Sequence, residues 1–309
     1  MNNDKEMIDT MSVSHDFQAM IYSHLSLEVV FFLVYNISVE FQVDYAINCE
    51  SLRENPGKTS EKRRLTLIDF HTHILPGIDD GSQDISMTEI MLREEMRQGV
   101  NLVAATPHFY ADQISIDGFL DRRAQAQAQT ERLIQEADTP LPAVIDGAEV
   151  YYFPGMGHAQ EISRLCIGET NTILVELPFE QWDSDVLRDV EALITRQKLN
   201  VVLAHVERYI GFQKDKSVWN RMLALPLTPQ INAGSFRKSS GLFHSDKKRK
   251  FCLDFLQAFP RTIVGSDCHN LENRPPNLAF AMEEIGNALC AESLQSIDAA
   301  VRKVLGRVE

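Results

Sequence analysis

The sequence has little cysteine, no Cys-x-x-Cys pair and no long apolar run. Its five cysteines are scattered through 309 residues and odd in number, which argues against a disulfide framework and indicates a reducing compartment. The first ten residues are polar and acidic, whereas a signal peptide begins with a basic and then an apolar segment. We therefore expect a cytoplasmic protein.

Positive charge is also scarce. The chain has 30 Lys and Arg residues against 44 Asp and Glu residues, a formal net charge of −14. Binding to a nucleic-acid backbone depends largely on Lys and Arg that neutralise phosphates, so this balance disfavours a nucleic-acid partner. Hydrophobic residues make up 44% of the chain, which is ordinary for a globular protein with a substantial core.

Residues 1–64 differ from the rest and are interpreted as an N-terminal extension and linker, either genuine or the product of an upstream start codon. The most apolar stretch, Ile21–Ile37, is only seventeen residues long, shorter than a membrane span, so we expect no stable membrane insertion. Gly57–Ser60 resembles the end of a phosphate-binding loop, but Leu52 occupies the position where that motif requires glycine. We reject a nucleotide site there.

From residue 65 to the C-terminus, short apolar segments alternate with amphipathic ones. The predicted strands are Leu65–Phe70, Val100–Ala105, Ala143–Ile145, Thr172–Leu177, Val201–Ala204, Thr228–Asn232 and Thr262–Gly265. The predicted helices are Ile85–Gln98, Phe119–Glu136, His158–Leu165, Ser184–Lys198, Lys216–Leu225, Asp246–Ala258, Leu278–Leu289 and Ala291–Leu305. Alternating strands and helices predict an α/β fold with a parallel sheet, and this number of units favours a closed barrel.

Imidazoles and carboxylates recur where these predicted strands end. They are His71 and His73, His108, Glu149, His205 with Glu207, and Asp267 with His269. Catalytic residues of β/α barrels lie at the carboxyl ends of the strands, so we expect these side chains to share one site. Alternation along the first strand predicts that Asp69, His71 and His73 point the same way. Nitrogen and oxygen ligands of this kind suit a site of two or three divalent metals such as manganese, iron or zinc.

Two arginines follow ligand positions closely. Arg208 comes directly after His205-x-Glu207, and Arg274 lies shortly after His269. A guanidinium binds two phosphate oxygens at once, so an arginine beside metals suggests a phosphate ester as substrate. Phe179 and Trp182, after the fourth strand, either line the rim of such a site or pack in a loop. The packing interpretation is preferred for both.

A thiol mechanism is the competing interpretation. Cys268 and Arg274 match the Cys-x5-Arg spacing of thiol-based phosphatases, in which a thiolate attacks phosphorus. Such loops are rich in small residues, whereas this one contains Glu272, which would repel phosphate. Alternation also predicts that Cys268 points away from its neighbours Asp267 and His269. The metal interpretation is therefore preferred.

The motifs together resemble the polymerase-and-histidinol-phosphatase (PHP) metallophosphoesterases. They are His71-x-His73, Asp79-Asp80-Gly81, Thr106-Pro107-His108, Glu149, His205-x-Glu207-Arg208 and Ser266-Asp267-x-His269. Two segments, 71–81 and 266–276, are most similar to the bacterial manganese-dependent protein-tyrosine phosphatases associated with capsule and exopolysaccharide synthesis. The resemblance extends from about Leu67 to Leu289. Val206 is a departure, because the family usually has proline there.

This resemblance implies a distorted (β/α)7 barrel at residues 65–309 with a trinuclear centre, and a tyrosine autokinase of the same polysaccharide system as partner. One metal would be held by His71, His73, Glu149 and Asp267, a second by Glu149 and His205, and a third by Asp80, His108 and His269. Arg208 and Arg274 would hold the phosphate, with Asp80 also taking part in catalysis. The expected mechanism is attack on phosphotyrosine by a metal-bridged hydroxide.

Three alternatives remain at this stage. The same site would also suit histidinol phosphate or another small phosphomonoester, and it would suit a nucleic-acid phosphodiester, which the net charge disfavours. A metal-stabilised scaffold without turnover would not need the two arginines. Asp69 is either an orienting partner for an imidazole or a structural hydrogen-bonding residue. The oligomeric state is left open.

Overall fold

The computed structural model describes residues 67–238 and 246–306, and the predicted extension and linker at 1–64 lie outside them. The strands are β1 (Leu67–Thr72), β2 (Val100–Ala105), β3 (His108–Phe109), β4 (Ala143–Asp146), β5 (Glu149–Tyr151), β6 (Thr172–Glu176), β7 (Asn200–Leu203), β8 (Thr228–Asn232) and β9 (Ile263–Gly265). All of their pairings are parallel.

Two short strands, β3 and β5, were not predicted, and each follows a predicted strand after a two-residue break. β2 and β3 follow one another across Thr106-Pro107, and β4 and β5 follow one another across Gly147-Ala148. β2 pairs with β4 and β3 pairs with β5, so the strand order β1-β2-β4 continues into β3-β5-β6-β7-β8-β9. β2 and β4 correspond to the second and third of the seven predicted strands, and β3 and β5 are additional.

The first and last strands meet and close the barrel. Thr72 bridges to Cys268 in parallel orientation. The amide of Asp267 donates to the carbonyl of His71 at 2.8 Å, and the amide of His73 donates to the carbonyl of Cys268 at 2.9 Å. The parallel α/β barrel predicted from the sequence is therefore confirmed as a distorted (β/α)7 barrel.

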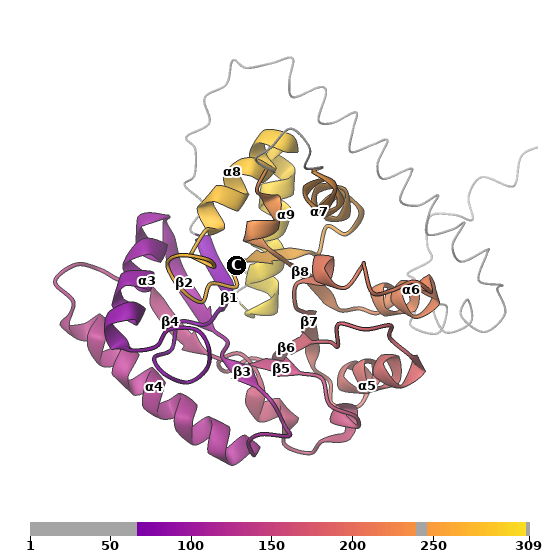
Figure 1. Ribbon diagram of the computed structural model, residues 1–309, viewed down its shortest axis with the longest axis horizontal. Coiled ribbons are helices and arrows are strands. Elements are labelled where there is room, and N and C mark those ends of the chain that lie inside the picture. The colour runs from indigo at the N-terminus through magenta and orange to yellow at the C-terminus, as the bar shows by residue number, and fades with distance from the viewer. Residues whose placement is uncertain (1–66, 239–245, 307–309) are drawn as a thin grey trace, which may run out of the picture. The chain divides into compact units, whose positions relative to one another are not determined.

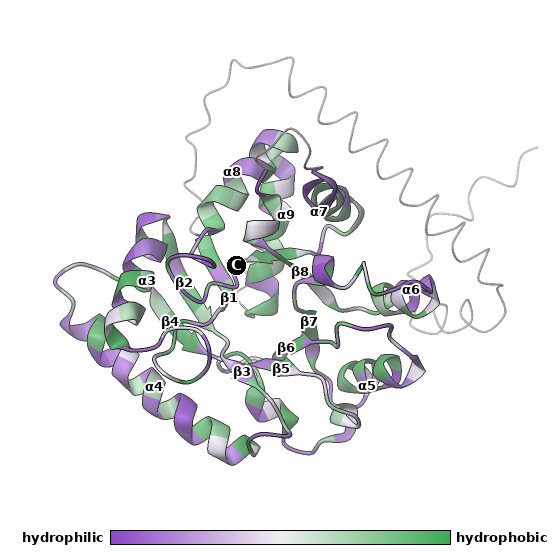
Figure 2. Ribbon diagram, in the orientation of Figure 1, coloured by the Kyte–Doolittle hydropathy of each residue, from purple (hydrophilic) through white to green (hydrophobic). Residues whose placement is uncertain are grey.

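Helices surround the strands (Figure 1). They are α3 (Ile85–Arg97), α4 (Ile116–Glu136), α5 (Ser184–Thr195), α6 (Lys216–Ala224), α7 (Lys247–Ala258), α8 (Leu278–Ala288) and α9 (Ala291–Val304). Hydrophilic and hydrophobic residues alternate along α4 (Figure 2), where the buried positions recur every three or four residues, as helical geometry requires of a face packed on a sheet. None of the helices in the described part of the chain has the length and hydropathy of a membrane span.

The barrel interior has a separate apolar cluster. Ile68 and Phe70 of β1 pack there with side chains of β2, β6, β7 and β9, and the end of α9 adds Val301 and Val304. The hydroxyl of Thr172 donates to the carbonyl of Val304. α9 therefore packs against the interior at the strands' amino ends and leaves their carboxyl ends for polar residues.

The predicted helix His158–Leu165 is wrong. Two single-turn 3-10 helices occupy this region, η1 (Met156–His158) and η2 (Ile162–Leu165). The carboxylate of Asp189 on α5 accepts hydrogen bonds from the amides of Gly155 and Gly157, which fixes the segment against α5. A Cβ atom at Gly157 would lie 2.5 Å from the carbonyl oxygen of Asp189. The helical geometry ends at Ala159, whose backbone is extended, and η2 begins only at Ile162.

The interior cluster generates a stability prediction. Phe70 is completely buried, whereas Ile90 on α3 is 51% exposed. Phe70→Ala should lower the free energy of unfolding by about 3–5 kcal/mol because it leaves a cavity in the barrel, and Ile90→Ala by less than about 0.5 kcal/mol. Urea denaturation followed by circular dichroism measures both. Equal shifts of the two midpoints would contradict the assignment of Phe70 to the core.

Candidate metal centre

The strand exits bring all eight predicted ligands together at one end of the barrel. They are His71 from β1, His73 directly after it, Asp80 from the loop that follows, His108 from β3, Glu149 from β5, His205 after β7, and Asp267 and His269 after β9. Most of these side chains are buried, but the side chain of Asp80 is 68% exposed. The site is thus open to solvent on the side where Asp80 lies.

One group consists of His71, His73, Glu149 and Asp267. The Nε2 atoms of the two imidazoles lie 3.2 Å apart. Oε2 of Glu149 is 3.3 Å from each of them, and Oδ1 of Asp267 is 3.5 and 3.4 Å away. Four donor atoms facing a common centre in this way can hold one divalent cation.

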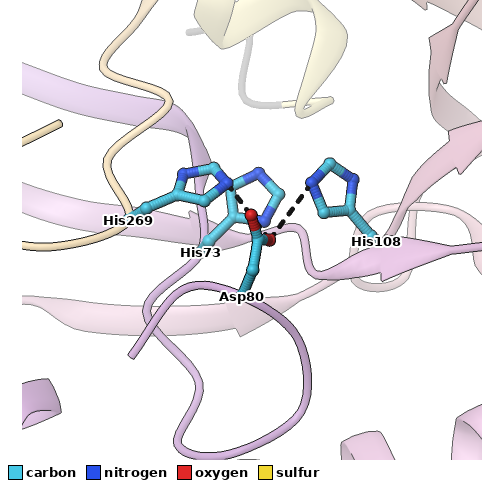
Figure 3. Close-up of side chains that lie close together, drawn as sticks. All are labelled: His73, Asp80, His108 and His269. Atoms are coloured by element: carbon cyan, nitrogen blue, oxygen red, sulfur yellow. Dashed lines mark ion pairs between the residues drawn. The ribbon is translucent and has the colours of Figure 1, made fainter. Parts of the chain in front are cut away.

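A second group consists of His73, Asp80, His108 and His269. Figure 3 shows the Asp80 carboxylate between the rings of His269 and His108, with His73 beside them. Oδ1 of Asp80 lies 3.5 Å from Nε2 of His108 and 3.5 Å from Nε2 of His269. The family resemblance implies one metal for three of these four residues, Asp80, His108 and His269.

Glu176 belongs to a third group that the sequence reading missed. It forms a candidate ligand set with His108 and Glu149, and its Oε1 lies 3.3 Å from Nε2 of His205. The same His205 atom lies 2.9 Å from Oε1 of Glu149. Glu176 is the last residue of β6, so the rule that functional residues occupy strand exits would have found it. The sequence reading instead considered only the residues after this strand.

The donor set fits divalent cations. Several buried side-chain atoms in the site have no hydrogen-bond partner among residues 67–238 and 246–306: Glu149 Oε2, Asp267 Oδ1, His108 Nδ1, His205 Nδ1 and His269 Nε2. Buried polar atoms without partners are costly, and cations would satisfy several of these. The donors are nitrogen and oxygen, which suits manganese, iron or zinc.

The close packing of imidazoles and carboxylates shifts the pKa values of Glu149 and His205. Burial raises the pKa of Glu149, but the neighbouring imidazoles of His71, His108 and His205 outweigh it and hold the pKa well below the usual range. Burial lowers the pKa of His205, but Glu149 and Glu176 outweigh it and raise the pKa to about 9. The carboxylates thus favour nearby positive charge. Protons on the imidazoles and metal ions compete to supply it.

Residues behind the ligands fix their orientation. Nδ1–H of His73 donates to Asp79 at 2.7 Å, which directs the Nε2 atom of this ring to the centre. Asp79 also accepts from the amides of Gly81 and His108. The sequence predicts no role for Asp79 beyond its place in the Asp79-Asp80-Gly81 motif. A Cβ atom on Gly81 would lie 2.1 Å from the carbonyl oxygen of His73, so this turn packs directly on the ligand strand.

Two further residues from β8 support the site. Oε1 of Gln230 accepts from the amide of His205 at 2.7 Å and lies 3.2 Å from Nδ1 of His71. The side-chain amide of Asn232 donates to Oδ2 of Asp267. Sequence analysis did not select either residue, although Asn232 ends the sixth predicted strand.

The predicted orientation of Asp69 is wrong. The pairing register of β1 shifts between Asp69 and Thr72, so strict alternation does not hold there. Oδ1 of Asp69 accepts from the amide of Ser266 at 2.9 Å and from the amide of His71 at 3.3 Å, and its carboxyl lies beside Glu95 of α3. Asp69 therefore links the first and last strands and does not orient an imidazole.

The two predicted arginines lie at the rim. One terminal nitrogen of Arg274 is 2.5 Å from Oδ2 of Asp267, and one of Arg208 is 4.0 Å from the same oxygen. Their side chains are 38% and 39% exposed, so both are accessible to a ligand. The Arg208 guanidinium lies 4.5 Å from the ring centre of Phe179. Val206, in place of the usual proline, is buried within the turn η3 (Val206–Arg208).

The rim residues predicted after the fourth strand differ from one another. Trp182 is buried, stacks on Trp219 and donates from its indole to the carbonyl of Pro178, so it packs in the loop as preferred. The ring of Phe179 stacks with the His205 ring at a centroid distance of 5.8 Å, and the Arg208 guanidinium lies over the Phe179 ring. The prediction that Phe179 only packs in a loop is therefore incomplete, because this side chain also contacts a ligand candidate and a rim arginine.

Cys268 does not face the site. Its side chain is fully buried, and its Sγ lies 3.8 Å from Oε1 of Glu95 on α3. Burial, together with the carboxyls of Glu95 and Asp69, raises the pKa of this thiol well above the usual value. A protonated, buried thiol is a poor nucleophile.

These features define a β/α barrel with a cluster of imidazole and carboxylate ligands at the carboxyl ends of its strands. The family model described as "Capsular polysaccharide synthesis, CpsB/CapC" matches residues 67–301. The chain belongs to this CpsB/CapC family.

Named relatives agree with this membership. The tyrosine-protein phosphatase YwqE of Bacillus subtilis is 32% identical over 214 residues, covering 67% of this chain and 79% of YwqE. CpsB of Streptococcus agalactiae is 27% identical over 248 residues, covering 75% of this chain and 98% of CpsB. A crystal structure from work on YwqE and on CpsB of Streptococcus pneumoniae, described as metal-dependent tyrosine phosphatases, has a TM-score of 0.65 and 25% identity and covers 78% of this chain and 96% of its own.

Metal content tests the role of Glu149. This carboxylate belongs to two of the three ligand groups, so Glu149→Gln should lower the metal bound per chain by about half or more, because it removes charge that both groups use. Mass spectrometry of the protein after dialysis against manganese measures the content.

Glu169→Gln is the matched control, since Glu169 is exposed on the surface. It should bind as much metal as the wild type. Circular dichroism checks that both variants fold. A folded Glu149→Gln protein with wild-type metal content would exclude Glu149 as a ligand.

Proposed function

We propose that this protein is a metal-dependent protein-tyrosine phosphatase that acts in capsular or exopolysaccharide synthesis. The observation that carries the proposal is the placement of Arg208 and Arg274 beside Asp267, directly at the ligand cluster. Guanidinium groups at a polynuclear site suit a phosphoryl group rather than a neutral substrate. Family membership and the tyrosine phosphatases among the relatives support the same activity.

The two arginines bind and orient the phosphoryl group in this proposal. Both converge on one oxygen of Asp267, and both are partly exposed. A bound phosphate dianion can therefore reach both guanidinium groups and pair with them. The Phe179 ring supports the Arg208 guanidinium from one face, which limits the orientations that Arg208 adopts. Positioned donors of this kind stabilise charge on the equatorial oxygens of a transferring phosphoryl group.

The metal centre is proposed to hold two or three manganese ions, with iron or zinc as substitutes. His71, His73, Asp80, His108, Glu149, Glu176, His205, Asp267 and His269 would hold them. Divalent cations at such a site lower the pKa of water and neutralise phosphoryl oxygens. A tyrosine phenolate leaves readily because the pKa of the phenol is near 10, so the chain needs no strong general acid.

A tyrosine autokinase of the same polysaccharide system, in the cytoplasm, is the proposed physiological substrate. The phosphotyrosine would lie on an accessible segment of that kinase, since the site opens at the exposed Asp80. Histidinol phosphate serves as the comparison substrate because it is a small alkyl monoester that suits the same metal centre.

The purified protein should hydrolyse a phosphotyrosine peptide with a kcat/KM at least about tenfold above that for histidinol phosphate. The phenolate is the better leaving group, and the arginines serve the phosphoryl group of either substrate. Phosphate release measures both rates. Chelation should abolish hydrolysis, and added manganese should restore it.

Turnover of histidinol phosphate alone would contradict the assignment as a tyrosine phosphatase. Activity that survives complete removal of metal would contradict the metal-dependent mechanism.

A separate variant distinguishes the thiol mechanism. Cys268→Ser should retain at least about half of the wild-type kcat, because the buried thiol does not face the cluster. Steady-state hydrolysis of the phosphotyrosine peptide at saturating manganese provides the measurement. An inactive but folded Cys268→Ser enzyme that is also insensitive to chelator would favour a thiolate nucleophile instead.

A further inference from the structure

A pocket of about 420 Å³ adjoins the metal centre. Asp79, Asp80 and His108 form one side of it. The other side comes from the segment after β3 and from the start of α4, and contributes Tyr110, Gln113, Ile114, Phe119 and Arg122. Two candidate ligands line the pocket. When the phosphate of a substrate lies at the ligand cluster, the parts of the substrate next to the phosphate can therefore reach the pocket.

The lining of this pocket is apolar at its base and carries a cation. Ile78 and Phe119 are almost fully buried, and Phe119 packs edge-on against Phe109. Arg122 is an exposed residue of α4 whose guanidinium donates to the carbonyl of Ile78 at 2.9 Å. This hydrogen bond holds the guanidinium against the loop that carries Asp79 and Asp80.

Arg122 has no carboxylate partner within 4.0 Å among residues 67–238 and 246–306. Its neighbour Arg123 differs, since it is buried and pairs with Asp146 at 2.7 Å. The hydrogen bond to Ile78 uses one of the five N–H donors of Arg122, so others are available to a ligand. An arginine fork pairs most strongly with a carboxylate or phosphate.

We propose that this pocket binds an acidic side chain of the substrate close to the phosphotyrosine, and that Arg122 pairs with its carboxylate. Methylene groups of glutamate match the apolar base, and its carboxylate matches the guanidinium. The protein has a net charge of −14, which repels acidic peptides at long range, so a local cation is required to select them. This inference rests on the proposed tyrosine phosphatase activity and adds a sequence preference to it.

The test uses phosphotyrosine peptides in which one position at a time is Glu, Gln or Lys. The positions varied are the two before and the two after the phosphotyrosine. At one position or more, the wild-type enzyme should show a kcat/KM about threefold higher for Glu than for Gln, as expected of an exposed ion pair. In Arg122→Gln the Glu-to-Gln ratio should fall to about one. In Arg122→Glu the preference should change to Lys at that position.

Ratios within one variant cancel any general change in activity. Arg132→Gln is the matched control, because Arg132 is also exposed and lies further along α4, and it should keep the wild-type ratio. A wild-type ratio of one at every position, or a preference that persists in Arg122→Gln, would overturn the inference.

p-Nitrophenyl phosphate, which has no flanking residues, separates this inference from the proposed function. Wild-type hydrolysis of this compound and of the peptides without any Glu preference would remove only the pocket assignment. Failure of the metal-loaded wild type to hydrolyse any aryl phosphate would overturn the proposed function and the inference together.

Discussion

The carboxylate of Glu149 is the interaction on which the site depends. It is buried at the centre of the barrel's carboxyl end, within 3.3 Å of nitrogens of His71, His73, His108 and His205. A buried carboxylate is costly unless positive charge accompanies it, and here that charge must come from imidazolium groups or from bound cations. The same requirement explains why so many strand exits carry histidine.

Closure of the barrel brings this carboxylate and its partners together. Hydrogen bonds between the segments of His71–His73 and Asp267–Cys268 join the first strand to the last. Asp69 strengthens this junction from the helix side by accepting from the amide of Ser266. Ligands nearly 200 residues apart in sequence thus become neighbours through backbone pairing, and the side chains of Asp79, Gln230 and Asn232 then set their orientation.

Sequence patterns predicted seven of the strands, most helices and seven of the eight candidate ligands because each depends on local properties, and the family resemblance added Asp80. Apolar runs predict strands, and the exits of parallel strands lie at one edge. Local patterns did not predict the extended backbone at Ala159 between η1 and η2, which follows a segment whose amides bond to Asp189 of α5. Glu176 was missed although the strand-exit rule includes it, and the role of Asp79 depends on a hydrogen bond to His73.

The sequence alone determined the fold class, the family resemblance and the chemical type of the site, because periodicity, residue order and ligand identity are properties of the chain itself. Tertiary structure decided which ligands share a centre, that Asp69 and Cys268 face α3, and that Arg122, beside the site, has no carboxylate partner within 4.0 Å in the described part of the chain. For Asp69 the physical reason is the irregular register of β1 between Asp69 and Thr72. Each shift reverses the face that a side chain occupies, and only the assembled barrel fixes where such shifts occur.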